Sequence, residues 1–215
     1  MKKLLMKELR LALHPTNVIF LLFAAMLLIP SYPYYVAFFY TTLGVFFTCL
    51  TGRENRDIEY TLLLPVRRAD VVRARILLTV LLEAAQVLLS IPFAVLNRRL
   101  YPLGNMAGME ANVALFGLVL VMYGLFNVVF FPLYYRNPNK IGAAFLLGGL
   151  AEGAFIVLAE LAVHLVPFVR RYLDTADPTY LAPKLAVLVI GVALFAALTL
   201  LAARLSERRF ERFDL

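Results

Sequence analysis

The sequence has no tryptophan, one cysteine and few charged residues for its length. The single cysteine, Cys49, excludes an internal disulfide bond. Only 16% of the 215 residues are charged and 62% are hydrophobic, whereas soluble domains average about 25% and about 45–50%. With a mean hydropathy of +0.82, the chain is predicted to be an all-α polytopic membrane protein, with residues 1–215 forming a single transmembrane domain.

Motifs of nucleotide hydrolases and of intramembrane enzymes are also absent. The sequence contains no G-x-x-x-x-G-K-[ST] loop, no HExxH, no EExxxR and no G-x-S-x-G. His14 and His164 are expected on opposite sides of the membrane, which argues against a metal site. No basic and aromatic platform for nucleic acid is present. We therefore expect no catalytic residue, no metal ligand, no cofactor bound by this chain and no nucleic-acid partner.

Long stretches without charge predict six membrane spans. Residues 15–52 carry no charged side chain, and this length suits two helices of roughly 20 residues each. Pro30 and Pro33 supply the break between spans at 15–30 and 34–51. The other spans are expected at 76–96, 111–135, 141–161 and 185–203.

Three segments outside the spans have features of a membrane interface. Residues 1–14 place basic and leucine side chains at helical spacing, which predicts an interfacial helix, or simply a basic flank to the first span. Tyrosines beside the first break are expected as an interfacial aromatic group: Tyr32, Tyr34 and Tyr35. Residues 162–183 form a semi-polar extracytoplasmic segment, in which we expect a short re-entrant or interfacial helix around 161–172.

The distribution of basic residues predicts the orientation. With six spans, sixteen of the 21 Lys and Arg residues lie on the side that holds both termini. The other five are Arg98, Arg99, Arg170, Arg171 and Lys184. Basic residues concentrate in cytoplasmic loops, so we expect both termini in the cytoplasm and the chain in the cell membrane.

The stretch 53–75 is the most charged part of the chain, with ten charged residues between two apolar runs. Ile58 and Leu62 lie four residues apart, which predicts a short helix with an apolar stripe. Pro65 ends this helix, and Asp70 suits the first turn of the next one. The stretch is either a docking element for a soluble partner or a solvated loop between helices.

Three polar side chains within the spans are candidates for a substrate path: Glu83, Gln86 and Glu152. A charge in the bilayer is costly, so such residues should face the protein interior or water. Glu152 lies within a GxxxG spacing and alternatively fixes helix packing. Glu160 and His164, four residues apart, form either a proton relay or metal pair, or else a solvated pair near the membrane boundary.

The layout resembles a known family. A basic amphipathic start, six spans and a charged stretch that contains L-L-P-V-x-R at residues 63–68 are similar to permease subunits of ABC-2 type transporters. The similarity extends to small bacterial permeases that resemble exporters of antimicrobial peptides. One difference is Arg67, where the family often has a Ser or Thr whose hydroxyl would cap the next helix.

This resemblance implies an exporter subunit with a cytoplasmic coupling helix within 53–75. A separate ABC ATPase subunit, which binds ATP and Mg, would grip that helix, and a second permease copy or a sister permease would complete the complex within membrane lipid. The residues expected to contact the ATPase are Arg56, Asp57, Ile58, Glu59, Tyr60 and Leu62. The alternative is a standalone proton-coupled secondary transporter that uses Glu83 and Glu152.

Overall fold

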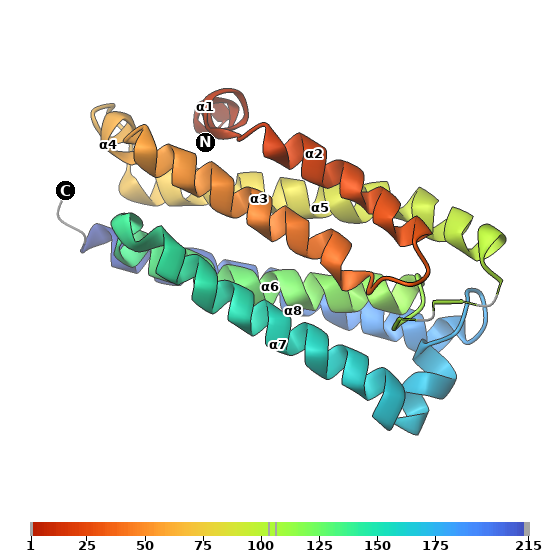
Figure 1. Cartoon of the computed structure of the whole chain (residues 1–215). Helices are drawn as coiled ribbons and strands as arrows, with labels where there is room; N and C mark the ends of the chain where they lie inside the picture. The colour runs from red at the N-terminus through yellow and green to blue at the C-terminus, as the bar shows by residue number, and fades with distance from the viewer. Residues whose placement is uncertain (1, 103, 106, 213–215) are drawn as a thin grey trace.

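The computed structural model describes residues 2–102, 104–105 and 107–212, and every regular element within them is a helix. The long helices run side by side along one bundle (Figure 1). They are α3 (Tyr35–Glu54), α5 (Arg68–Leu100), α6 (Val113–Arg136), α7 (Ile141–Leu165) and α8 (Leu181–Glu211). The short ones are α1 (Lys2–Lys7), η1 (Glu8–Ala12), α2 (Thr16–Leu22), η2 (Phe23–Leu28), α4 (Asp57–Leu62), η3 (Pro138–Lys140) and η4 (Val169–Leu173). The predicted all-α polytopic fold is confirmed.

The bundle has two distinct ends. The N-terminus, α4 and the last turns of α8 lie at one end (Figure 1), which we call the terminus end. The α5–α6 loop and the α7–α8 connection lie at the other, the distal end. Among the described residues, five helices are long and apolar enough to cross a membrane, and the count is six if the bent pair Lys2–Ala12 and Thr16–Leu28 forms one span.

The first span is short. The α1–η1 segment meets the following segment at 87°, the geometry expected of an interfacial helix that leads into a span. Seven α-helical residues and six 3-10 residues follow, and these rise about 22 Å, less than the roughly 30 Å of a hydrocarbon core. This segment packs on α3 and α5, so neighbouring helices support it.

Two helices are longer than the expected spans. Helix α5 has 33 residues and α8 has 31, which correspond to about 50 Å and 46 Å. The spans expected at 76–96 and 185–203 are therefore central parts of helices that continue beyond the apolar region. At the terminus end, the overhanging turns hold each other, because Arg73 forms an ion pair with Glu207 at 2.7 Å.

Helices α6 and α8 form the closest packed pair. A Cβ atom on Gly191 would collide with the backbone of Gly117, and one on Gly117 would lie 2.7 Å from the carbonyl oxygen of Val187. Glycines at the crossing thus allow the two backbones to touch. The pair forms the centre against which α3, α5 and α7 pack.

The tyrosines after the first break are placed differently from the expectation. Tyr34 and Tyr35 are buried, whereas Tyr32 is 36% exposed. The Tyr34 hydroxyl accepts a hydrogen bond from Asn97 Nδ2 at 2.8 Å, and the Tyr35 hydroxyl donates to Met109 Sδ at 3.6 Å. Each hydroxyl has a hydrogen-bond partner, Asn97 of α5 for Tyr34 and the Met109 sulfur of the α5–α6 loop for Tyr35, so the rings can enter the core.

The α7–α8 connection also differs in detail. Helix α7 continues to Leu165, and the short helical turn η4 begins only at Val169. The helix expected around 161–172 is thus divided between the last turn of α7 and η4. Pro167 lies between the two parts, where its missing N–H interrupts the helical hydrogen bonds.

Candidate coupling site

Helix α4 stands out from the bundle at the terminus end. Arg56 precedes it with a positive φ of 51°, which turns the chain sharply after α3. Pro65 follows it and separates it from α5, as the sequence predicts. Arg67 is the N-cap residue of α5 but makes no side-chain cap, and its guanidinium instead donates to the Asp70 carboxylate at 2.9 and 3.1 Å.

The six residues expected to contact an ATPase divide between two faces of α4. Arg56, Glu59 and Tyr60 are exposed, Tyr60 to 64%. Leu62 is partly buried. The next two residues, Leu63 and Leu64, are 81% and 57% exposed and extend the outward face.

Asp57 and Ile58 turn inward instead. Ile58 is 8% exposed and packs in a core cluster that includes Val72 and Ile76 of α5. Asp57 forms ion pairs with Lys7 and Arg75 at 2.6 and 2.7 Å. These two residues therefore attach α4 to the bundle, and the outward face consists of Arg56, Glu59, Tyr60, Leu63 and Leu64.

Four charged side chains connect α4 to α1, η1 and α5, which lie behind it. Lys7 of α1 contacts Glu8 of η1 at 3.0 Å and Asp57 at 2.6 Å. Arg75 of α5 contacts the same two carboxylates, Glu8 at 2.5 Å and Asp57 at 2.7 Å. We call Lys7, Glu8, Asp57 and Arg75 the ion network. Its two cations and two anions balance, so the interior carries no net charge there.

The ion network is desolvated and closely packed. The side chains of Glu8 and Arg75 are 2% and 4% exposed. A Cβ on Gly52 would lie 3.3 Å from Arg75 Nη1, so a glycine in the last turn of α3 leaves room for the guanidinium. Arg75 also donates to Cys49 Sγ at 3.9 Å. Removing one partner would leave a buried charge uncompensated, which is the costly case for such pairs.

The first turns of α5 are also attached to α8. Arg73 donates two hydrogen bonds to the Glu207 carboxylate at 2.7 and 3.0 Å. Arg68 donates to the carbonyl oxygen of Phe210 at 3.1 Å and lies over its ring at 5.8 Å. The start of α5 is therefore joined to α8 by these contacts, and α4 is joined to α5 through Arg75.

The three candidates for a substrate path are fully buried between the helices. Glu83 accepts a hydrogen bond from Asn127 Nδ2 of α6 at 3.1 Å. Gln86 donates to the carbonyl oxygen of Ala37 at 3.2 Å, and Glu152 accepts from Thr42 Oγ1 at 2.9 Å. Each contact joins two helices, so these residues fix packing in the structure.

One oxygen of each candidate has no hydrogen-bond partner within the described part of the chain: Glu83 Oε1, Gln86 Oε1 and Glu152 Oε1. None of the three lines the cavities at the two ends of the bundle. Their role in a substrate path stays a prediction.

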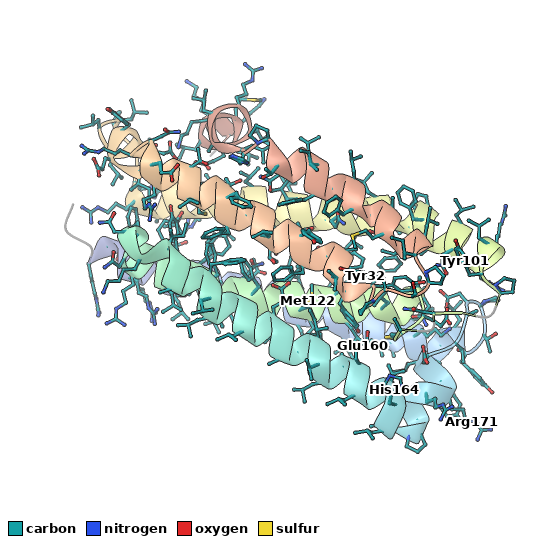
Figure 2. The ribbon with its side chains drawn as sticks, in the orientation of Figure 1. Tyr32, Tyr101, Met122, Glu160, His164 and Arg171 are labelled. Atoms are coloured by element: carbon teal, nitrogen blue, oxygen red, sulfur yellow. The ribbon has the colours of Figure 1, made fainter. Side chains whose placement is uncertain are left out.

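Glu160 and His164 lie along the last turns of α7 beside the distal loops (Figure 2). Glu160 Oε2 accepts a hydrogen bond from the backbone N–H of Met109 at 3.2 Å, and His164 is exposed. Glu160 thus holds the α5–α6 loop. Among the residues that the structure describes, no group of three or more His, Cys, Asp and Glu side chains is arranged to hold a metal.

Sequence patterns do not identify Lys7, Glu8 and Arg75, which complete the ion network. Arg75 is one of ten charged residues in 53–75, and nothing in its neighbours distinguishes a buried arginine from a solvated one. The only signal is Glu8, an acid within a basic amphipathic helix, which requires a cation from elsewhere if that helix face is buried.

A family model described as ABC-2 family transporter protein matches residues 3–211 of the chain. The chain belongs to the ABC-2 transporter family. No curated protein and no solved structure matches it. The family match supports the transport function and the multi-pass membrane location of this ABC-2 permease. The permeases of this family are membrane components that associate with an ABC ATPase, and they are not themselves the ATPase.

Proposed function

We propose that the chain is the permease subunit of an ATP-driven exporter in the cell membrane, with its terminus end in the cytoplasm. A separate ABC ATPase, which binds ATP and Mg, docks on the outward face of α4. Two copies of this permease, or this chain with a sister permease, frame the export path. The observation that carries the proposal is the contrast between the two faces of α4. One face is exposed and apolar at Tyr60, Leu63 and Leu64, and the other is joined to α5 by the Asp57–Arg75 ion pair.

The exposed face suits a protein partner. Exposed aromatic and leucine side chains next to charged ones are typical of binding surfaces, in which a few aromatic residues supply most of the binding energy. Tyr60 at 64% and Leu63 at 81% exposure project from a short element that has charged residues on both sides. A groove on an ATPase would take such a helix by its apolar side chains.

The attachment of α4 explains how force would reach the spans. Closure of the ATPase around ATP would move α4, and the Asp57–Arg75 pair would carry the movement to α5. The Arg73–Glu207 pair would carry it on to α8. Coupling requires that the ATPase bind the two states of the bundle with different free energies. The location of the ion network at the root of α4 supports this route.

The test is co-purification of the permease with an ABC ATPase from the same membrane. Tyr60→Asp and Leu63→Asp should lower the recovered ATPase by more than about tenfold, the effect of losing hot-spot side chains. Arg208→Asp, an exposed charge change at the terminus end on α8, is the matched control and should retain the ATPase. Full recovery with both α4 variants would contradict the proposal. Ile58 is unsuitable because its burial would confound binding with folding.

A second candidate is proton-coupled transport without an ATPase. The unpartnered oxygens of Glu83 and Glu152 favour it, because buried carboxyls in membrane proteins often carry protons. Proteoliposomes separate the two functions: the exporter requires ATP and the ATPase, whereas the secondary transporter runs on a proton gradient alone. Glu83→Gln and Glu152→Gln should abolish only the second kind of transport.

A further inference from the structure

Two adjoining cavities lie at the distal end, between α5, α6, the α5–α6 loop and the α7–α8 connection. The larger has a volume of about 480 Å³ and the smaller about 340 Å³. Both fall within the range of small-molecule sites, about 300–1,000 Å³. They share Arg98, Glu110 and Ala176 in their walls, so they adjoin, and we call the pair the distal cleft.

The two parts of the distal cleft differ in chemistry. The larger cavity is walled mainly by apolar side chains of α5 and α6, among them Ile91, Val95 and Phe116. The smaller is walled by polar groups of the loops, such as Tyr101 and Thr175. A molecule that fills both cavities must have an apolar part and a polar part. The distal cleft therefore suits an amphiphile.

Two arginines of the distal cleft are available for a ligand, Arg98 where the two cavities adjoin and Arg99 in the wall of the larger one. Arg98 and Arg99 are exposed, and neither forms a hydrogen bond or an ion pair with any of the residues that the structure describes. Lys184 nearby differs, because it is fully buried and pairs with Asp177 at 3.0 Å. Guanidinium groups bind phosphate in a bidentate manner and suit anionic head groups.

The acids in the cleft are compatible with an anionic ligand. Glu110 Oε1 already accepts a hydrogen bond from the backbone N–H of Asn105 at 2.8 Å, and Asp174 Oδ1 accepts one from the N–H of Glu110 at 2.9 Å. Burial raises the pKa of both carboxyls. Asp177 is neutralised by Lys184.

The distal cleft lies where α5 leaves the apolar region. Leu88, Val95 and Leu96 are exposed on α5 at 65%, 56% and 41%, as expected of a helix face that contacts lipid tails. Arg98 and Arg99 follow directly, at the level where basic side chains reach lipid head groups. Val95 lines the cleft and also faces outward, so an acyl chain can enter from the bilayer.

We propose that the distal cleft binds an anionic phospholipid of the surrounding membrane. Its phosphate lies between Arg98 and Arg99, and one acyl chain lies along Ile91, Val95 and Phe116. The binding site is a property of the permease alone and requires neither the ATPase nor transport.

The absence of tryptophan from the chain provides a clean test. Val95→Trp puts a single reporter into the cleft of the full-length protein, reconstituted into phosphatidylcholine vesicles. Brominated phosphatidylglycerol, which quenches tryptophan on contact, should quench this reporter more strongly than brominated phosphatidylcholine at the same mole fraction. Leu158→Trp, on the 66% exposed face of α7, is the matched reporter and should show no head-group preference. Equal quenching by the two lipids at Val95→Trp would overturn the proposal.

Substitution of the arginines tests the contact with the head group. Arg98→Gln and Arg99→Gln should each reduce the preference roughly fivefold, the contribution of one basic residue near an anionic surface. Arg171→Gln, at the same end (Figure 2), is the control and should leave it unchanged. A preference that survives the double substitution would refute the site, provided that buried Cys49 stays protected from thiol reagents, which shows that the variant is folded.

The source of the phosphate is tested by competition. Soluble glycerol 3-phosphate added to the vesicles should leave the quenching unchanged, because an acyl chain in the cleft adds apolar contact that the soluble ester lacks. Displacement of the brominated lipid by the soluble ester would overturn the lipid assignment and identify a site for soluble phosphate esters.

Discussion

The two ends of the bundle are joined by different kinds of polar contact. At the terminus end, charged side chains of α1, η1, α4 and α5 contact one another, as in the Arg75 pairs with Glu8 and Asp57. At the distal end, most of these contacts join a side chain to the backbone of another loop, and the Lys184–Asp177 ion pair is added to them. Asn112 Nδ2 donates to the carbonyl oxygens of Leu173 and Thr175 at 2.7 and 3.0 Å.

The distal contacts also fix the start of α6. Asn112 Oδ1 accepts a hydrogen bond from the N–H of Leu115 at 3.1 Å, and Asp177 Oδ2 accepts one from the N–H of Val113 at 3.0 Å. These donors are the orphan N–H groups of a helix N-terminus. Their partners come from the α7–α8 connection and from the N-cap, so the loops and the helix hold one another in a single arrangement.

The difference suggests a division of roles. A side chain bound to a backbone group has one geometry, whereas charged side chains on α1, η1, α4 and α5 can exchange partners when one of these elements moves. Two cations facing two anions offer such an exchange without leaving any charge alone. The terminus end therefore suits the transmission of movement, and the distal end suits a fixed cap. The following variants test this comparison at each end.

The largest effect is expected when the ion network loses its central cation. Arg75→Ala leaves the buried Glu8 with only the partly exposed Lys7 as its cation, and loss of one partner of a buried ion pair typically costs about 3–5 kcal/mol. The readout is Cys49, the chain's single cysteine, which is fully buried next to Arg75. The temperature at which a thiol-reactive dye labels Cys49 in purified protein should fall by many degrees.

Arg73→Ala is the matched control for this variant. Arg73 is an arginine two residues away in the same helix, and it also has a carboxylate partner, Glu207, but its side chain is 50% exposed. Exposed ion pairs contribute little to stability, so the labelling temperature should change slightly. Equal losses in the two variants would show that burial of the ion network does not set its importance.

A smaller effect is expected at the distal end from Asp177→Ala. The substitution leaves the fully buried Lys184 with only the carbonyl oxygen of Thr175, and it removes the acceptor for Val113 N–H. Because Asp177 is 30% exposed, the loss should be on the order of 2 kcal/mol, less than for a fully buried pair. A local reporter is Val163→Cys in a Cys49→Ser background, since Val163 is 3% exposed in the distal core.

Asp177→Asn provides the contrast. The amide oxygen can still accept from Val113 N–H, but it offers no charge to Lys184. If the ion pair matters most, Asn should behave like Ala, and if the helix cap matters most, Asn should behave like the native Asp. A labelling temperature unchanged in both variants would contradict the view of a distal cap held by this residue.

Composition and periodicity sufficed to predict the spans and the break at Pro65. A run without charges can only be placed in a bilayer as a helix, and proline interrupts a helix regardless of its surroundings. The exposure of Tyr60 on α4 was also predictable, because local helical spacing determines which side chains share a face.

Long-range pairing was not predictable in this way. Glu8 and Arg75 are 67 positions apart in the numbering, and only the packing of η1 on α5 brings them together. The inward turn of Asp57 and Ile58 also depends on the bundle, because an isolated helix exposes every side. Tyr34 and Tyr35 enter the core because Asn97 and Met109 meet their hydroxyls there, whereas the sequence alone places aromatic residues beside a break at the interface.

The smallest effect concerns pH at the distal end. Burial raises the pKa of Glu110 and Asp174, so the folded state holds their protons more tightly than the unfolded chain. The stability that they contribute is therefore greatest in acid and declines as the pH rises from the ordinary carboxyl pKa through the raised one. The labelling temperature of Val163→Cys should fall as the pH rises over this window, and the labelling temperature of Cys49 should fall by a smaller amount.

Glu110→Gln removes one of the two titrating groups while its amide oxygen can still accept from Asn105 N–H. Compared with the parent at the same pH, it should raise the distal labelling temperature on the order of 1 °C at neutral pH, with the difference vanishing in acid. Comparison at each pH cancels the effect of pH on the dye reaction itself. A difference of the same size at all pH values would mean that Glu110 acts through packing, and that its ionisation does not affect the stability of the distal end.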